Sequence, residues 1–82
     1  MIHVRILLFA FLADDVGHRE LDLQLDAGAT VADAMDRLAR DYRTIGAARD
    51  RIATAVNAEY VQADQILGDG DELALIPPVS GG

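Results

Sequence analysis

The chain has 82 residues, of which 51% are hydrophobic and 26% charged, and its formal net charge is −7. This length allows one domain with one modest core, and the composition excludes a disordered chain. The acidic balance argues against nucleic acid as a partner, because phosphates demand a basic face, whereas it allows a basic protein surface. No apolar run approaches the roughly 20 residues that span a bilayer, so we expect a cytoplasmic protein without a membrane segment.

Side chains that could build a self-contained active site are scarce. Cysteine is absent, and histidine occurs only as His3 and His18. The chain therefore offers no thiolate nucleophile or disulfide. Neither histidine has a ligand partner at a recognisable spacing, so we predict no bound metal. Gly68 and Gly70 precede a predicted strand rather than a helix, which is not the order of a phosphate-binding loop.

The first half of the chain predicts two strands. Residues 2–12 form the first strand, and Leu7 and Phe9 should lie on its open face. Residues 13–17 read as a turn, and residues 20–26 as a second strand with its leucines inward. The two strands are expected to form a hairpin. The core-facing positions of the first strand are Ile2, Val4, Ile6, Leu8 and Ala10.

A helix is predicted to follow, with Thr30 as its N-cap and Asp33 three residues later as part of a weak capping box. Its apolar residues recur at helical spacing and should form one buried stripe. The members of this stripe are Val31, Ala34, Met35, Leu38 and Tyr42. Residues 44–51 have a poor pattern and are interpreted as a loop with about one short helical turn.

The second half predicts three more strands, at residues 52–56, 59–61 and 72–76. Asn57-Ala58 joins the first two, but a tight hairpin favours positive φ at both turn positions, which Ala58 tolerates poorly. We therefore expect another turn type there. The first and last strands are the most apolar, which predicts that they pair centrally and in parallel. One amphipathic helix on one face of a mixed sheet gives an α+β domain.

The C-terminal stretch has an unusual design. Pro77 and Pro78 lack backbone donors and cannot continue a sheet ladder, so we divide the chain into a domain at residues 1–76 and a tail at residues 77–82. Beyond the prolines the side chains shrink from Val79 through Ser80 to Gly81-Gly82. This shape suits a terminus that enters a narrow channel and reacts there. Without cysteine, any sulfur must be carried on the terminus. The alternative is a frayed end.

Five stretches of the sequence carry motifs: Ile6–Ala10, Gly28–Asp33, Ala55–Asn57 with Tyr60-Val61, Asp69–Ala74 and Pro77–Gly82. Together they resemble the small subunits of molybdopterin synthase, a ubiquitin-like sulfur-carrier family, along essentially the whole chain. The resemblance implies a β-grasp fold, in which a mixed sheet of four to five strands packs on one main helix. The first loop is about two residues longer than expected, and Ala58 replaces a common glycine.

The resemblance also implies a reaction at Gly82. An E1-like adenylyltransferase would use ATP to join Gly82 to AMP, and a sulfur donor would displace AMP to leave a thiocarboxylate. The tail, Pro78-Val79-Ser80-Gly81, would insert into the large synthase subunit, where sulfur passes to a pyranopterin precursor of the molybdenum cofactor. The chain would then be a non-catalytic subunit of a heterotetramer. It would bind no cofactor itself, and the catalytic groups would lie on the large subunit.

By the same resemblance, Phe9, Tyr60 and Ile76 would form the patch that docks on the partner. Strand alternation supports Phe9 independently and places Ile76 opposite Leu73 and Leu75, whereas Tyr60 depends on the resemblance alone. Other functions stay open. The chain could carry sulfur for thiamine or tRNA thiolation, or it could be a ubiquitin-like modifier of protein lysines. It could also be an interaction domain whose terminus stays unmodified.

Overall fold

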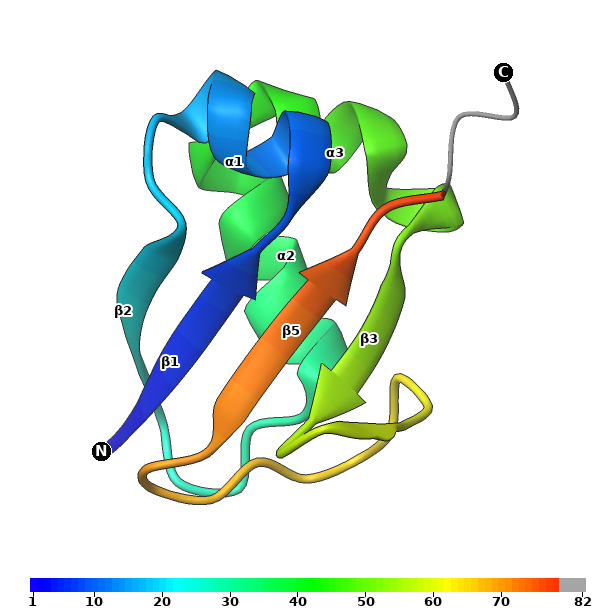
Figure 1. Ribbon diagram of the computed structural model, residues 1–82. Helices are drawn as coiled ribbons and strands as arrows, with labels where there is room; N and C mark the ends of the chain where they lie inside the picture. Colours follow the sequence, from blue (N-terminus) through cyan, green and yellow to red (C-terminus); the bar gives the residue numbers. More distant parts are fainter. Residues whose placement is uncertain (79–82) are drawn as a thin grey trace.

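The computed structural model describes residues 1–78, which form one mixed sheet with helices on one side and at one end of it (Figure 1). The strand order is β2-β1-β5-β3-β4. The helix α2 crosses one face of the sheet, and α1 and α3 lie at the end that is uppermost in Figure 1. The elements are β1 (Ile2–Leu8), α1 (Ala10–Val16), β2 (Glu20–Leu25), α2 (Val31–Asp41), α3 (Arg43–Ala48), the 3₁₀ turn η1 (Arg49–Arg51), β3 (Ala53–Val56), β4 (Glu59–Tyr60) and β5 (Glu72–Ile76).

The centre of the sheet is the parallel pair of β1 and β5, in register from Arg5–Glu72 to Leu8–Leu75. The strands β2 and β3 flank this pair in antiparallel orientation. The prediction that the first and last strands pair centrally and in parallel is confirmed, as is the α+β class. Because β5 leads directly into Pro77, this central pairing fixes the point at which the tail leaves the domain.

The core lies between the sheet and α2. Alternate residues of β1 and β5 enter it, and Leu73 and Leu75 are fully buried. The predicted stripe of α2 is buried too, with Tyr42 partly buried at its end. Thr30 caps α2 through a capping box, because its Oγ1 accepts from the Asp33 backbone N–H at 3.3 Å while the Asp33 carboxylate accepts from the Thr30 N–H at 2.9 Å. These expectations are confirmed.

The first strand is shorter than predicted. It ends at Leu8, and residues 10–16 form α1 instead of extending the strand into a turn. The first two strands pair in antiparallel orientation, as a hairpin requires, but the predicted short turn between them is wrong. The helix is favoured because Leu12 is completely buried in the core, where Val16 packs beside it one turn later. Gly17, at φ 87°, ends the helix by donating its N–H to the Ala13 carbonyl at 2.9 Å. Ala10 is exposed rather than buried.

Residues 43–51 are helical rather than a loop, because Ile45 and Ala48 enter the core from α3. The Asn57-Ala58 turn is also different from the expectation. Asn57 has φ 51° and Ala58 has φ 71°, so both take the positive φ that a tight hairpin turn favours. In the connection before β5, Leu67 is buried in the core while its neighbour Ile66 is exposed.

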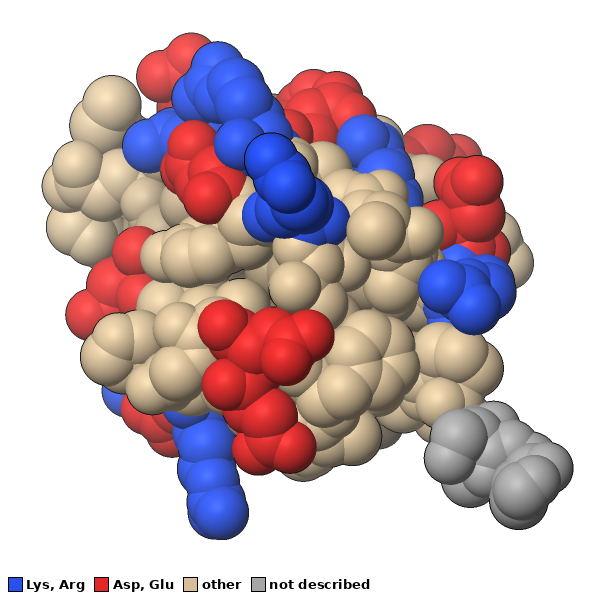
Figure 2. Space-filling model, turned by 90° about the horizontal axis from the view of Figure 1, so that it is seen from above, with Lys and Arg blue, Asp and Glu red and all other residues tan. Residues whose placement is uncertain are grey.

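Within residues 1–78, no helix combines the length and the hydropathy of a bilayer-crossing segment. The charged side chains on the end of the molecule formed by α1 and α3 are interspersed, with acidic and basic groups next to one another (Figure 2). On this face, therefore, the net charge of −7 does not form one continuous acidic patch.

Candidate functional site

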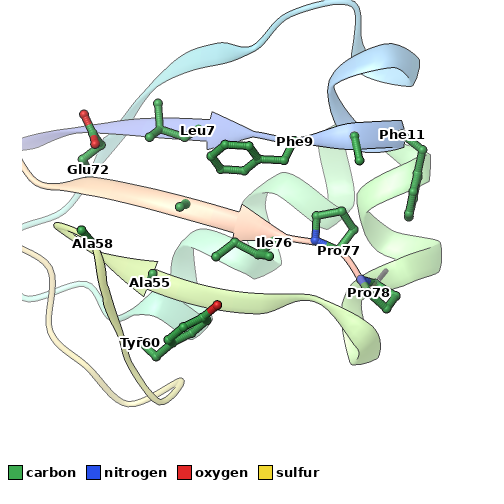
Figure 3. Close-up of a pocket in the computed structure, with 12 residues that line it drawn as sticks. Leu7, Phe9, Phe11, Ala55, Ala58, Tyr60, Glu72, Ile76, Pro77 and Pro78 are labelled. Carbon is green, nitrogen blue, oxygen red and sulfur yellow. The ribbon is translucent and has the colours of Figure 1, made fainter. Parts of the chain in front are cut away.

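An apolar groove of about 770 Å³ runs over the face of the sheet opposite α2 (Figure 3). It is built mainly from β1, β3, β4 and β5, together with the residues that follow β1 and β5. Its lining residues are Leu7, Phe9, Ala10, Phe11, Ala55, Ala58, Tyr60, Glu72, Ala74, Ile76, Pro77 and Pro78. We call this feature the sheet groove.

The shape of the sheet groove follows from one row of paired residues that crosses four strands. Leu7 pairs with Ala74, Ala74 with Ala55, and Ala55 with Tyr60. Paired residues project from the same side of a sheet, so this row has large side chains at its ends and methyl groups in the middle. A hollow over the two alanines is the consequence.

The sheet groove brings together the three residues of the predicted patch. Phe9 is 46% exposed and Tyr60 is 74% exposed, while Ile76 is half-buried on the side of β5 opposite Leu75. Phe9 lies beyond the end of β1, but its backbone is still extended, at φ −128° and ψ 158°. It therefore continues the alternation of the strand. That these residues dock on a partner stays a prediction.

Phe11 was not among the predicted patch residues, although it is 40% exposed and lines the same groove. Its sequence signal was available, because it shares the parity of Leu7 and Phe9. The small floor residues Ala55 and Ala74 gave no comparable signal, since alanine occurs on either face of a sheet and their pairing across strands is a matter of register.

The base of the C-terminal tail lies at one end of the sheet groove. Pro77 is buried directly after β5, whereas Pro78 is exposed and lines the groove. The other predicted tail residues lie outside the described part of the chain: Val79, Ser80, Gly81 and the reacting residue Gly82. The described structure thus places the start of the tail beside the apolar surface that the patch residues share.

The chemistry of the sheet groove is that of apolar binding. Its charged side chain, Glu72, lies 3.7 Å from Nη1 of Arg5 in an exposed ion pair, and the Tyr60 hydroxyl adds a second polar group. In the portion that the structure describes, no cluster of three or more histidine, aspartate or glutamate side chains is placed to hold a metal. The surface can receive apolar side chains of a partner and can pair charges at its Glu72 end.

The ThiS family model matches residues 6–82. The chain belongs to the ThiS family. It is 33% identical over 81 residues to the molybdopterin synthase sulfur carrier subunit of Arabidopsis thaliana, covering 99% of this chain and 84% of that protein. It is 34% identical to the Mycobacterium tuberculosis protein of the same name over the whole of both chains. It is 40% identical to small archaeal modifier protein 1 of Haloferax volcanii, covering 92% of this chain and 95% of that one.

Solved structures agree with this assignment. The crystal structure of the Haloferax volcanii modifier matches with a TM-score of 0.86 and 34% identity, covering 96% of this chain and all of that one. A ubiquitin of Caldiarchaeum subterraneum matches with a TM-score of 0.66 and 17% identity, covering 99% and 98% of the two chains, and this likeness concerns the fold alone. The ubiquitin-like β-grasp fold and the resemblance to the small subunits of molybdopterin synthase are therefore confirmed.

Proposed function

We propose that the chain is the sulfur carrier subunit of a molybdopterin synthase, which donates sulfur to a pyranopterin precursor in molybdenum cofactor biosynthesis. The observation that carries this proposal is the similarity, at 33% and 34% identity over 99% and 100% of the chain, to relatives that bear this name. The Pro-Pro-Val-Ser-Gly-Gly ending supports it, because a terminus without bulky side chains can enter a narrow channel.

Gly82 is the reacting residue of this proposal. An E1-like adenylyltransferase joins its carboxylate to the AMP moiety of ATP, and pyrophosphate leaves. A sulfur donor then displaces AMP, so that a thiocarboxylate replaces the carboxylate. After its sulfur attacks the precursor, water cleaves the bond between the acyl carbon and sulfur and restores the carboxylate. ATP is thus a substrate of the activating enzyme, and the carrier binds no cofactor of its own.

The sheet groove is the proposed docking surface for the large subunit. Phe9 and Tyr60 are large, exposed and mounted at opposite sides of a hollow, an arrangement that lets apolar side chains of a partner become buried between them. Pro78 lies at one end of the same groove, so a partner seated there would lie next to the start of the tail. The catalytic groups are expected on that partner, in a cytoplasmic heterotetramer of two carriers and two large subunits.

The experiment that tests this proposal compares the intact chain with a variant that lacks Gly82 and with one that carries an extra residue after it. Each is incubated with ATP, an E1-like activator and a sulfur donor, and then with a large synthase subunit and the precursor. We expect the intact chain alone to gain the mass of one oxygen-to-sulfur exchange and to support molybdopterin formation. Thermal melts should be equal for all three chains, because the altered residues follow the domain. Molybdopterin formation by the Gly82 deletion would contradict the proposal.

A second candidate function is covalent modification of proteins. The observation in its favour is the 40% identity to a protein named small archaeal modifier protein 1. Both functions begin with activation of Gly82, and they differ in the acceptor. Adducts in which Gly82 is joined to lysine side chains of other proteins, recovered after incubation with the activator, would favour the modifier. Transfer of sulfur without such adducts would favour the carrier.

A further inference from the structure

Two exposed aromatic residues that follow β1 line the sheet groove. Phe9 and Phe11 are 46% and 40% exposed, and the residue between them, Ala10, is exposed as well. An exposed aromatic ring does not gain the favourable free energy of burial, so two such rings close together in the sequence indicate a surface that contacts a binding partner or another part of the chain. Phe9 is already part of the predicted patch. Phe11 lies outside that patch.

The backbone holds Phe11 in place by an uncommon conformation. Ala10 has φ 51°, in the left-handed region, where a Cβ atom raises the free energy of the folded state. The chain turns there, and the backbone N–H of Leu12 donates to the Phe9 carbonyl at 3.1 Å. Leu12 is fully buried and so pins the first turn of α1 to the core. An unfavourable φ between two exposed aromatic residues suggests that their placement has a function.

Phe11 lies at the same end of the groove as the base of the tail. Phe11, Pro77 and Pro78 all line the groove, and Figure 3 shows Phe11 and Pro78 together at the end toward which β5 points. Pro77 is buried and Pro78 exposed. Because proline fixes φ near −65°, ψ is the main backbone freedom left at these two positions, and a side chain that packs against the rings restricts the direction in which the chain leaves Pro78.

We propose that Phe11 is a positioning residue for the sulfur-carrying tail. Its ring supports Pro78 and fixes the direction in which the chain leaves the domain, while Phe9 and Tyr60 provide the affinity for the partner. This inference rests on the proposed function. It assigns separate tasks to different parts of the groove: Phe9 and Tyr60, on its two sides, bind the partner, and Phe11, at the end where the tail begins, sets the direction of the tail.

Positioning of the tail and binding of the partner affect different kinetic quantities. A positioning residue acts on the rate at which the bound complex reacts, since a displacement of about 1 Å at the reacting atoms can lower a rate on the order of 100-fold. With Phe11→Ala we expect the rate constant of sulfur transfer at saturating large subunit to fall about tenfold or more, while the dissociation constant changes less than about threefold. Phe11→Leu should restore most of the rate, because a branched apolar side chain can still contact Pro78.

The experiment uses the full-length thiocarboxylated chain in single-turnover sulfur transfer to a large subunit, with affinity measured separately by titration. Phe9→Ala is the comparison and should raise the dissociation constant more than it lowers the saturated rate. Ile66→Ala is the matched control, because Ile66 is 61% exposed but lies outside the groove. A Phe11→Ala chain with an unchanged saturated rate would overturn the proposal.

Two further measurements keep this test separate from that of the proposed function. Nuclear Overhauser contacts between the Phe11 ring and Pro78 in the isolated protein should be present, and their absence would overturn the inference whatever the chain does. The same variants are also compared in ATP-dependent activation of Gly82, which a carrier and a modifier would share. A wild-type chain that is activated but inert with the large subunit would reject only the proposed acceptor. One that is not activated by any E1-like enzyme would overturn both proposals.

Discussion

The two faces of the sheet are built from the same strands, yet one is buried within the molecule and the other is open to solvent. On the face toward α2, the apolar side chains are covered by the chain's own helices and are almost completely buried. On the opposite face, the row from Leu7 to Tyr60 leaves an apolar groove open to solvent. The apolar surface of the first face is buried within the molecule. The apolar surface of the second face can be buried only when a partner binds. We therefore expect the stability of the fold to depend on the first face and partner recognition on the second.

The strand β5 shows this difference within five residues. Leu73 and Leu75 point into the core and are fully buried, whereas Ala74 and Ile76 face the groove and are half-buried. The same strand then continues into Pro77, where the tail begins. Substitutions on its two sides can therefore separate folding from recognition while the backbone context stays almost constant.

The largest effect on stability is expected from Leu73→Ala. Removal of a fully buried leucine side chain leaves a cavity and should lower the free energy of unfolding by about 2–5 kcal/mol. Ile76→Ala, on the groove side of the same strand, should cost about 1 kcal/mol, because that side chain is only partly buried. Urea unfolding of both variants measures the difference. Equal losses would contradict the assignment of stability to one face.

Phe9→Glu should produce the largest effect on binding. A charge placed at an apolar anchor should weaken binding to the large subunit by roughly 2–4 kcal/mol, while the free energy of unfolding should change by less than about 1 kcal/mol. Titration calorimetry and thermal melts measure the two quantities. Ile66→Glu is the control, since it puts the same charge on an exposed apolar residue outside the groove. If Phe9→Glu unfolds the protein, Phe9 belongs to the core and the comparison of faces fails.

Strong periodicity explains which parts of the fold could be predicted from the sequence. The parity of β1 and β5 and the helical spacing from Val31 to Leu38 each repeat several times, so the central strands and α2 were confirmed. Thr30 and Asp33 marked the start of the helix because capping depends on local chemistry. These signals are local, and they do not depend on how the rest of the chain packs.

The parts that could not be predicted depend on tertiary contacts. Residues 10–12 continue the parity of β1, so nothing local shows that a helix of seven residues begins at Ala10 and buries Leu12 in the core. Ile45 anchors an even shorter helix. For the groove, parity identified Phe9 and Ile76. Its floor of Ala55 and Ala74 required the register between β3 and β5, which the sequence does not specify.

The helical side of the molecule should resist even one added methyl group where two helices meet. A Cβ atom on Gly46 of α3 would lie 2.9 Å from the backbone oxygen of Ala39 in α2, so Gly46→Ala requires backbone movement. We expect a net loss of about 1–2 kcal/mol, because the cost of overpacking exceeds the gain in helix propensity. Gly68→Ala is the control, since its nearest neighbour, Oδ2 of Asp71, would lie 3.5 Å away at ordinary contact distance. Denaturant midpoints that move equally for both variants would contradict this packing.

The smallest effect is expected at the turn between β3 and β4, on the groove side. Ala58 has φ 71° and pays the cost of a Cβ atom in the left-handed region, of about 1–2 kcal/mol. Ala58→Gly removes this cost but gives the unfolded chain more conformational freedom, worth about 0.4–1 kcal/mol, so a net gain of about 0.5–1 kcal/mol remains. Asn57 shares the positive φ, yet its side chain donates to Asp71 at 3.0 Å and accepts from the Glu72 N–H at 3.1 Å. Asn57→Gly should therefore destabilise the protein, because both hydrogen bonds are lost. Urea unfolding should therefore shift the midpoint upward for Ala58→Gly and downward for Asn57→Gly, and partner affinity should change little with Ala58→Gly. Midpoint shifts of the same sign for the two variants would contradict this account of the turn.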